Sequence, residues 1–200
     1  MTVALTLLGD VRWRGAPVAG ERSQALLAAL AAAGGRPVRA ERLIDQVWGE
    51  EAPADAAKGL QVLVSRTRTA LGADAIVRDA VGYRLGVDPA EVDSVRLSAL
   101  ARDAAAALDD DAERAATLAG EALALANGLP APVEDEADPL AELRRAAASD
   151  LATARVVLAQ ACSRTGAHAQ ALTALEAAHA ERPDDEELAQ LARLLERLPA

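Results

Sequence analysis

The sequence predicts a mixed α+β domain followed by an all-α domain, and the distributions of glycine and charge support this division. Ten of the 13 glycines lie within residues 1–97, which places most of the turns there. The rest of the chain is rich in alanine, as expected for closely packed helices. Residues 1–97 carry 12 basic and 12 acidic side chains, whereas residues 98–200 carry 9 and 19. The net charge of −10 therefore belongs entirely to the predicted helical part.

The first elements of the α+β part are two short strands and a helix. Apolar runs in residues 3–9 and 11–14 suit strands, with a turn between them at Gly9 and Asp10. Residues 22–34 follow with Leu26, Leu27 and Leu30 on one face, and Gly34–Gly35 ends them. This pattern indicates an amphipathic helix with a glycine stop.

Two more helices and a hairpin complete this part. Residues 39–49 predict a short helix with an apolar face, and a third helix is expected to begin at Pro53 and to end at Gly72. Residues 75–87 contain two short apolar runs around Gly82, which predicts a β-hairpin. Strands, three helices and a hairpin in that order predict a winged helix, a fold that suits DNA because a helix fits the major groove.

The third helix has the composition of a DNA-contacting element. Leu60, Val64, Thr67 and Leu71 form its inward stripe, and no acidic residue occurs between Ala56 and Gly72. Gln and Arg make bidentate contacts with base edges, and Ser, Thr and Lys suit phosphates. The predicted DNA-binding residues are therefore those of this helix together with two arginines of the hairpin: Lys58, Gln61, Ser65, Arg66, Arg68, Thr69, Arg78 and Arg84.

A second interpretation of these residues stays open. Basic side chains on a surface helix are ordinary, and an α+β part of zero net charge lacks the usual basic footprint of a nucleic-acid-binding domain. The alternative hypothesis is a protein-interaction scaffold whose winged helix has weak or no DNA binding.

The chain resembles a known family through "RLIDQVWG", "LQVLVSRTRTALG" and "GYRL". These motifs are similar to those of the SARP/AfsR-type bacterial regulators, whose winged helix is of the OmpR/PhoB type. The resemblance covers residues 3–93. It implies that residues 1–93 form a DNA-binding domain, with residues 57–71 in the major groove and 76–86 as the wing. Residues 94–200 would form a bacterial transcriptional activation domain.

The sequence departs from the family pattern at several positions of the third helix. Leu63 stands where relatives commonly carry His, Ser65 where a basic residue is frequent, and Thr69 where Arg or Lys is usual. Thr67 occupies a position that is normally Leu in the inward stripe. These departures predict modest affinity for DNA and give the scaffold hypothesis its motivation.

The all-α part is expected to be tetratricopeptide-like. Residues 152–185 fit a 34-residue repeat, with a turn at Gly166, Ala171 five residues later and Pro183 ending the second helix. One long helix is expected over 140–165. Residues 94–126 predict an earlier helix pair, and residues 127–139 a loop. A further helix is expected after Asp184.

No enzyme chemistry is expected. His168 and His179 have no zinc-site spacing with Cys162, the acidic runs at 109–111 and 134–136 suit solvated surfaces, and no phosphate-binding loop occurs. We therefore expect no cofactor and no metal. A single cysteine and the lack of a signal peptide or a long apolar run indicate a cytoplasmic protein.

The resemblance also implies a mechanism and partners. Copies would bind side by side on direct repeats of double-stranded DNA near promoters, and would then recruit RNA polymerase as an activator. Self-association on DNA is expected. The activation domain stops at Ala200, short of the usual family length. Either the chain is a natural compact form, or it is a fragment of a larger regulator whose C-terminal effector or ATPase domains are absent from it.

Overall fold

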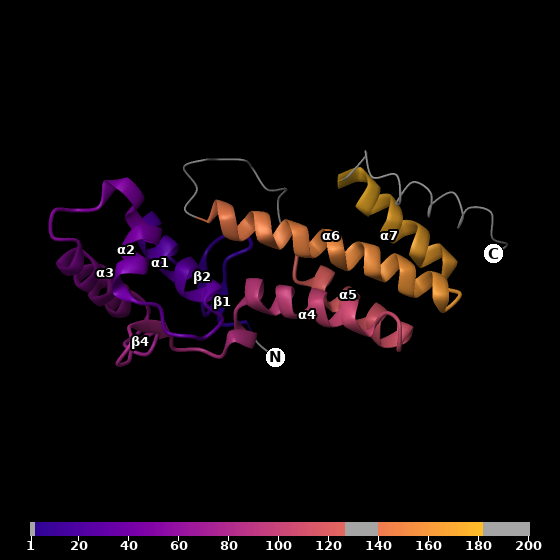
Figure 1. Cartoon of the computed structure of the whole chain (residues 1–200), viewed down its shortest axis with the longest axis horizontal. Helices are drawn as coiled ribbons and strands as arrows, with labels where there is room; N and C mark the ends of the chain where they lie inside the picture. The colour runs from indigo at the N-terminus through magenta and orange to yellow at the C-terminus, as the bar shows by residue number, and fades with distance from the viewer. Residues whose placement is uncertain (1–2, 127–139, 182–200) are drawn as a thin grey trace. The chain divides into compact units, whose positions relative to one another are not determined.

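The chain forms two compact units, of which the first contains the sheets and the second is helical (Figure 1). The computed structural model describes residues 3–126 and 140–181. The first unit runs to Arg96 and also includes residues 140–145, and the second contains the remaining described residues. An α+β winged helix is therefore followed by an all-α unit, as predicted.

A small antiparallel sheet opens the first unit. Strand β1 (Leu5–Thr6) pairs with β2 (Arg12–Trp13), and β2 pairs with β3 (Ala16–Pro17). The third strand was not predicted. Arg14 and Gly15 connect β2 to β3 with φ angles of 49° and 84°, the left-handed conformations that a two-residue hairpin turn requires.

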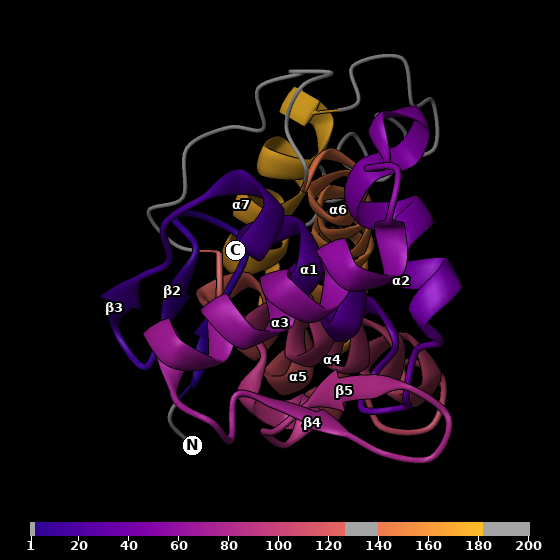
Figure 2. The same cartoon turned by 90° about the vertical axis from the view of Figure 1, so that its left-hand side faces the viewer.

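Three helices pack against each other and bury side chains in the same core as this sheet (Figure 2). Helix α1 (Glu21–Ala32) buries Leu26, Leu27 and Leu30 completely, which confirms its predicted face. Helix α2 (Ala40–Trp48) buries Leu43 and Val47, and a short 3₁₀ turn, η1 (Gly49–Glu51), follows it.

Helix α3 (Ala56–Leu71) begins later than predicted, so the expected start at Pro53 is wrong. The Asp55 carboxylate accepts a hydrogen bond of 3.0 Å from the backbone N–H of Lys58. Because Asp55 is a good N-cap residue, the helix begins directly after it. Pro53 lies before the cap and close to Gly59, where an added Cβ atom would come within 2.9 Å of its ring.

The predicted hairpin is present as β4 (Ile76–Arg78) and β5 (Tyr83–Leu85). Val38 adds to the edge of β5 through two backbone hydrogen bonds with Tyr83, of 2.7 and 2.9 Å. The sequence predicts Gly82 as the glycine that permits the hairpin turn, and this pairing gives it a different role. Its φ is not left-handed; instead, a Cβ atom there would overlap the carbonyl oxygen of Val38. The position needs glycine for close approach of two backbones.

Asp93 lies near the end of the first unit's main segment and bonds back to its first strand region. A 3₁₀ turn, η2 (Pro89–Glu91), leads into α4 (Asp93–Ala107), and the Asp93 side chain is 5% exposed. Its carboxylate accepts hydrogen bonds of 2.9 and 3.1 Å from the N–H groups of Leu7 and Leu8. Burial raises the pKa of this carboxyl group, and the backbone donors oppose that effect.

The helical unit contains α5 (Ala112–Ala124), α6 (Ala141–Arg164) and α7 (His168–Glu181) in addition to most of α4. The long helix over 140–165 and the helix pair within 94–126 are thus confirmed. Gly166 has a φ of 79° at the turn between α6 and α7, and Ala171 is fully buried, as the repeat predicts. Pro183, the residues 127–139 that were expected to form a loop, and the helix expected after Asp184 lie outside the described residues.

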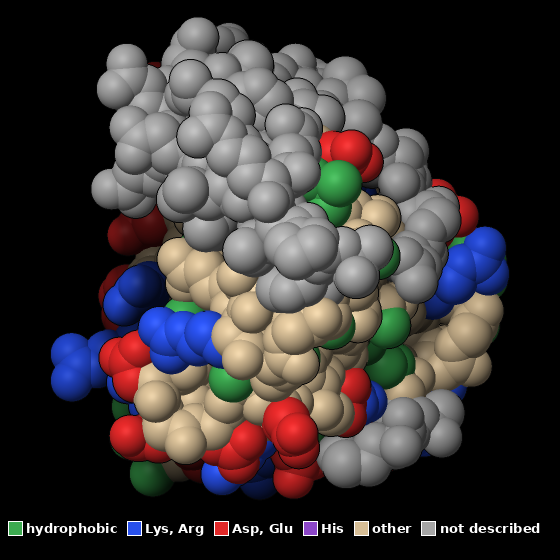
Figure 3. Space-filling view, turned by 90° about the vertical axis from the view of Figure 1, so that its right-hand side faces the viewer, with side chains coloured by type: hydrophobic (Ala, Val, Ile, Leu, Met, Phe, Trp, Pro, Cys, Tyr) green, Lys and Arg blue, Asp and Glu red, His purple; other side chains and the backbone are tan. Residues whose placement is uncertain are grey.

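The surface of the helical unit carries both signs of charge (Figure 3). Arg164 contacts the Asp109 carboxylate at 3.1 Å and also donates to the carbonyl of Leu108. Cys162 is buried, which raises the pKa of its thiol. Within the described ranges, no helix is long and apolar enough to cross a membrane.

Candidate DNA-binding surface

Helix α3 buries the stripe that its spacing predicts. Leu60, Val64 and Thr67 are at most 3% exposed, and Leu71 packs against the same core at intermediate burial. Thr67 is satisfied despite its polar side chain, because its hydroxyl donates to the carbonyl of Leu63 at 2.9 Å and lies 3.3 Å from the Ser23 hydroxyl of α1. Because this stripe is buried, the side chains on the opposite side of α3 are exposed to solvent.

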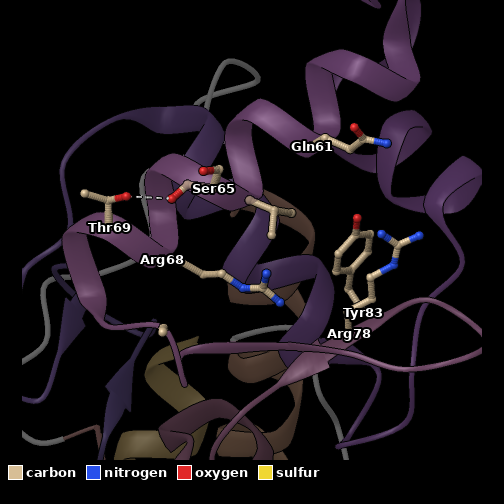
Figure 4. A pocket seen from close by; sticks show the side chains of 8 residues that line it. Gln61, Ser65, Arg68, Thr69, Arg78 and Tyr83 are labelled. Atoms are coloured by element: carbon tan, nitrogen blue, oxygen red, sulfur yellow. Dashed lines mark hydrogen bonds between the residues drawn. The ribbon is translucent and has the colours of Figure 1, made fainter.

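A groove of about 450 Å³ separates α3 from the hairpin (Figure 4). Its floor and walls come from α3, from Ala73 after the helix and from the hairpin strands. Five of the eight predicted DNA-binding residues line it, and the full lining is Gln61, Val64, Ser65, Arg68, Thr69, Ala73, Arg78 and Tyr83. The fold therefore brings together side chains of α3 and β4 that are far apart in the sequence.

Arg68 lies at the side of α3 that faces the hairpin, and it is only partly exposed. Its Nε donates a hydrogen bond of 2.8 Å to the carbonyl of Ile76 in β4. Among the described residues, no hydrogen-bond or ion-pair partner is present for its two terminal nitrogens, and Figure 4 shows the guanidinium group extended into the groove. This arrangement orients a cationic group for contact with an anion or a base edge.

The two hairpin arginines lie on opposite faces of the strand pair. Arg78 pairs in register with Tyr83 and its guanidinium lies 5.8 Å from the Tyr83 ring centroid, within the groove. Arg84 lies between Tyr83 and Leu85 in β5, and both of these neighbours are buried. Because side chains alternate along a strand, that of Arg84 lies on the opposite face of the hairpin. It donates to the carbonyl of Leu85 at 3.1 Å and does not line the groove.

The remaining predicted residues, Lys58 and Arg66, are exposed on the outward side of α3 outside the groove. Val62 shares this side and is 43% exposed. Val62 is not among the residues predicted from the sequence, because polar and basic side chains are the ones that indicate contacts with DNA. Its helical position, between the inward residues Leu60 and Val64 and out of phase with both, was the available signal.

A second groove, of about 560 Å³, lies between α1, the start of α2 and the tip of the hairpin. Arg36, Arg39 and Arg42 line it together with Val38 and Val81. Among the described residues, none of these arginines forms an ion pair, although Arg36 donates to the carbonyl of Ala33 at 3.2 Å. Sequence reasoning missed this cluster, although three arginines within seven residues were a visible signal.

Residues 1–97 have no net charge, but one segment within them is basic. Residues 56–86, which contain α3 and the hairpin, carry five basic and two acidic side chains. Both acids are engaged: Asp74 pairs with Arg14 at 2.9 Å, and Asp79 accepts from the N–H groups of Val81 and Gly82 at 2.7 and 3.0 Å. This local excess of basic side chains favours an anionic partner. In the described part of the chain, no cluster of His, Cys, Asp and Glu could hold a metal ion.

The comparisons with known proteins agree with this geometry. Residues 18–85 match the family model described as transcriptional regulatory protein, C terminal. The chain is 34% identical over 200 residues to the regulatory protein AfsR of Streptomyces griseus, covering 94% of this chain and 20% of that protein. It is 32% identical over 138 residues to the transcriptional regulator RedD of Streptomyces coelicolor, covering 63% of this chain and 39% of the relative.

A solved structure shows the same architecture. Mycobacterium tuberculosis EmbR, in complex with a low-affinity phosphopeptide, superposes with a TM-score of 0.76 at 26% identity, over 96% of this chain and 54% of that one. The chain spans well under two thirds of the length of each of these relatives. The winged helix, the helical unit that follows it and the similarity to AfsR and RedD together show that the chain is similar to the SARP/AfsR-type transcriptional regulators, with an OmpR/PhoB-like domain over residues 18–85.

Proposed function

We propose that this chain is a sequence-specific DNA-binding activator of transcription that acts in the cytoplasm. The observation that carries the proposal is the groove between α3 and β4, where Gln61, Arg68 and Arg78 converge from separate elements. A major groove accepts an α-helix, so α3 enters it and the hairpin lies on the adjacent backbone as the wing. Arg68 and Gln61 then read base edges, and the other predicted residues bind phosphates.

The proposal assigns DNA binding to residues 1–93 and protein contacts to residues 94–200. The acidic helical part would contact RNA polymerase and a second copy of the chain on direct repeats, because its negative charge opposes a direct role on DNA. AfsR and RedD, which the chain resembles, are named as regulators, and this supports the assignment.

A selection from random duplexes tests sequence-specific binding. The full chain is incubated with a pool of double-stranded oligonucleotides at low salt, bound duplexes are amplified, and the cycle is repeated at physiological salt. We expect one consensus to emerge as a direct repeat. Selection of random sequences with a steep salt dependence would leave only non-specific binding, and recovery of no duplex would contradict the proposal.

Promoter activation needs its own experiment. Run-off transcription with bacterial RNA polymerase on a template that carries the selected repeat should increase when the chain is added. A matched template with a scrambled repeat should not respond. Reduced transcript from the intact template would make the chain a repressor and would contradict the activator assignment.

An interaction scaffold remains the second candidate. The zero net charge of residues 1–97 favours it, as does the internal hydrogen bonding of Arg68 and Arg84. A scaffold would bind no duplex above background at any ionic strength, so the same selection distinguishes the two functions.

A further inference from the structure

The second groove, of about 560 Å³, is lined by two kinds of side chain. The apolar ones come from α1, from the segment before α2 and from the hairpin tip, and they are Ala29, Ala32, Ala33, Pro37, Val38 and Val81. The polar ones are Arg36, Arg39, Arg42 and Gln46. Among the described residues that line the groove, none is acidic. The groove therefore combines apolar surface with positive charge.

Backbone contacts hold the hairpin tip in place beside this groove. Val38 exchanges two backbone hydrogen bonds with Tyr83, and a Cβ atom at Gly82 would come within 2.0 Å of the Val38 carbonyl oxygen. Within the tip, the Asp79 carboxylate accepts from the N–H groups of Val81 and Gly82 at 2.7 and 3.0 Å. Val81 is thus fixed relative to Val38 before anything binds. A preformed site of this kind requires little ordering when a ligand enters it.

The apolar lining is larger than a bare phosphate group needs. Val81 is 56% exposed, and it lines the groove together with the neighbouring apolar side chains. A single exposed valine is ordinary on a protein surface. Here it faces a concave space that it shares with three arginines. A phosphate bound by the arginines would leave this apolar surface in water, whereas a ligand with an apolar body would cover it. The lining therefore favours an organic ligand.

The arginines specify the charge of that ligand. Arg36, Arg39 and Arg42 lie within seven residues, and among the described residues none of them forms an ion pair. The Nε of Arg36 donates to the carbonyl of Ala33 at 3.2 Å, which orients its guanidinium group. Guanidinium groups bind carboxylate, phosphate and similar oxyanions through paired hydrogen bonds. The volume of the groove lies within the range of about 300–1,000 Å³ that is usual for small-molecule sites.

We infer that the second groove is a binding site for an amphipathic organic anion. Arg36, Arg39 and Arg42 hold the anionic head group, and the apolar body lies on Val38 and Val81. Such a ligand neutralises arginines that could otherwise bind DNA phosphates, so it competes with a duplex. The site itself is independent of the proposed function, whereas this competition rests on it.

Three probes separate the two requirements of the site. Anilinonaphthalene sulfonate has an apolar body and an anionic group, N-phenylnaphthylamine has the same body without the charge, and inorganic phosphate has the charge without the body. Binding of the first two to the full chain is followed by their fluorescence. Binding of phosphate is followed by its ability to displace the sulfonate.

We expect the sulfonate to saturate one site per chain and to bind at least about tenfold more tightly than the neutral compound, because hydrogen bonds to a charged group are strong. Phosphate should displace it only weakly, since it leaves the apolar surface uncovered. Equal affinities of the sulfonate and the neutral compound would remove the arginines from the site. Affinity of phosphate equal to that of the sulfonate would reduce the groove to a phosphate site. Either result would overturn the inference.

Matched variants locate the bound probe. Arg42→Ala should weaken the sulfonate by about tenfold and Val81→Ala by roughly fourfold, for the loss of one charged contact and of one buried methyl group. Arg102→Ala and Val62→Ala are the controls, because these side chains are an exposed arginine of α4 and an exposed valine of α3 outside the groove. Circular dichroism confirms that all variants keep their helix content. Equal affinities in the wild type and the four variants would place the probe elsewhere and would overturn the inference.

A duplex obtained by selection with the full chain tests the competition. Its affinity for the wild type, measured by fluorescence anisotropy, should fall as the sulfonate saturates the groove. Val81→Ala keeps the arginines and should need roughly fourfold more sulfonate for the same loss of DNA affinity. Saturable sulfonate binding with an unchanged affinity for the duplex would overturn the competition. Failure to select any duplex would overturn the proposed function, whereas the probe titrations would still decide whether the site exists.

Discussion

The Nε of Arg68 donates a 2.8 Å hydrogen bond to the carbonyl oxygen of Ile76, and this bond joins α3 to the first strand of the hairpin. Both elements are proposed to contact DNA, so the same side chain sets their separation and supplies charge to the groove between them. Arg68 consequently has a structural and a binding role, and a substitution should affect both.

Replacing Arg68 with alanine should weaken binding to a selected duplex by about 1–3 kcal/mol, the range for one good base contact. It should also lower the free energy of unfolding by about 1 kcal/mol, because the Ile76 carbonyl loses its donor. Arg66→Ala is the matched control, since Arg66 is exposed on the same helix and has no hydrogen-bond partner among the described residues. The control should reduce affinity without altering stability. Wild-type affinity of Arg68→Ala at fixed salt would remove Arg68 from the DNA contacts.

The two faces of the hairpin can be distinguished through the salt dependence of binding. Arg78→Ala should lower affinity for all sequences alike and reduce the slope of log K against log salt by about one unit, the effect of one lost phosphate contact. Arg84→Ala should have a smaller effect, because its side chain leaves the other face and donates to Leu85. Equal effects of the two variants would indicate that DNA contacts both faces, and an altered sequence preference with an unchanged slope would contradict the phosphate role.

The arginines of the second groove extend the phosphate-binding surface. Arg39→Ala and Arg42→Ala should each reduce the salt slope by about one unit while leaving the order of sequence preference unchanged. Arg102→Ala is the comparison, because Arg102 is an exposed arginine of α4 and lies beside Asp103. If all three variants behave alike, the second groove does not contact the duplex.

Asp93 gives the first unit a pH-dependent contribution to stability. Burial raises the pKa of its carboxyl group, so the native state retains a proton at pH values where the unfolded chain has lost it. The unfolded state then binds fewer protons, and the contribution of Asp93 to stability falls as pH rises from about 4 through the native pKa. Urea unfolding followed by tryptophan fluorescence reports this unit, because Trp13 and Trp48 are the two tryptophans of the chain.

Asp93→Asn removes the titration and leaves one oxygen to accept hydrogen bonds from Leu7 and Leu8. The variant should be less stable than the wild type, and the difference between them should be largest at the acid end of this pH range. A difference that grows as pH rises would mean that the native pKa lies below that of the unfolded chain, and would contradict the raised pKa.

Local patterns predicted most of the secondary structure and the inward stripe of α3, because helical and strand periodicities depend on neighbouring residues. The start of α3 was misplaced, since proline at a first helical position and Asp55 as a cap compete within a few residues. Close contacts between segments that are distant in the sequence could not be predicted from local patterns. The contact of Gly82 with Val38 and the second groove both arise from pairing across about 40 residues, which no local pattern encodes.

Leu140 shows this limit at the largest sequence separation. It is 1% exposed and belongs to the hydrophobic core of the first unit, 44 residues after Arg96. Leu143 packs against the same core, and Arg144 donates to the carbonyl of Gly9 at 2.8 Å. A domain boundary at residue 93 therefore separates part of the hydrophobic core of the first unit, in residues 140–145, from the proposed DNA-binding domain.

Leu140→Ala should consequently destabilise the first unit by about 2–5 kcal/mol, the usual cost of truncating a fully buried leucine. Tryptophan fluorescence during urea unfolding measures this loss in the unit that contains Trp13 and Trp48, and the affinity of the folded protein for a selected duplex should stay unchanged. Leu172→Ala, at a half-buried position of α7, is the control and should leave that transition in place. A chain shortened to residues 1–97 should show a loss at least as large, because it lacks both leucines and the Arg144 bond. A tryptophan transition that is unaltered both in Leu140→Ala and in the shortened chain would show that residues 1–97 are stable on their own, and would support a domain boundary at residue 93.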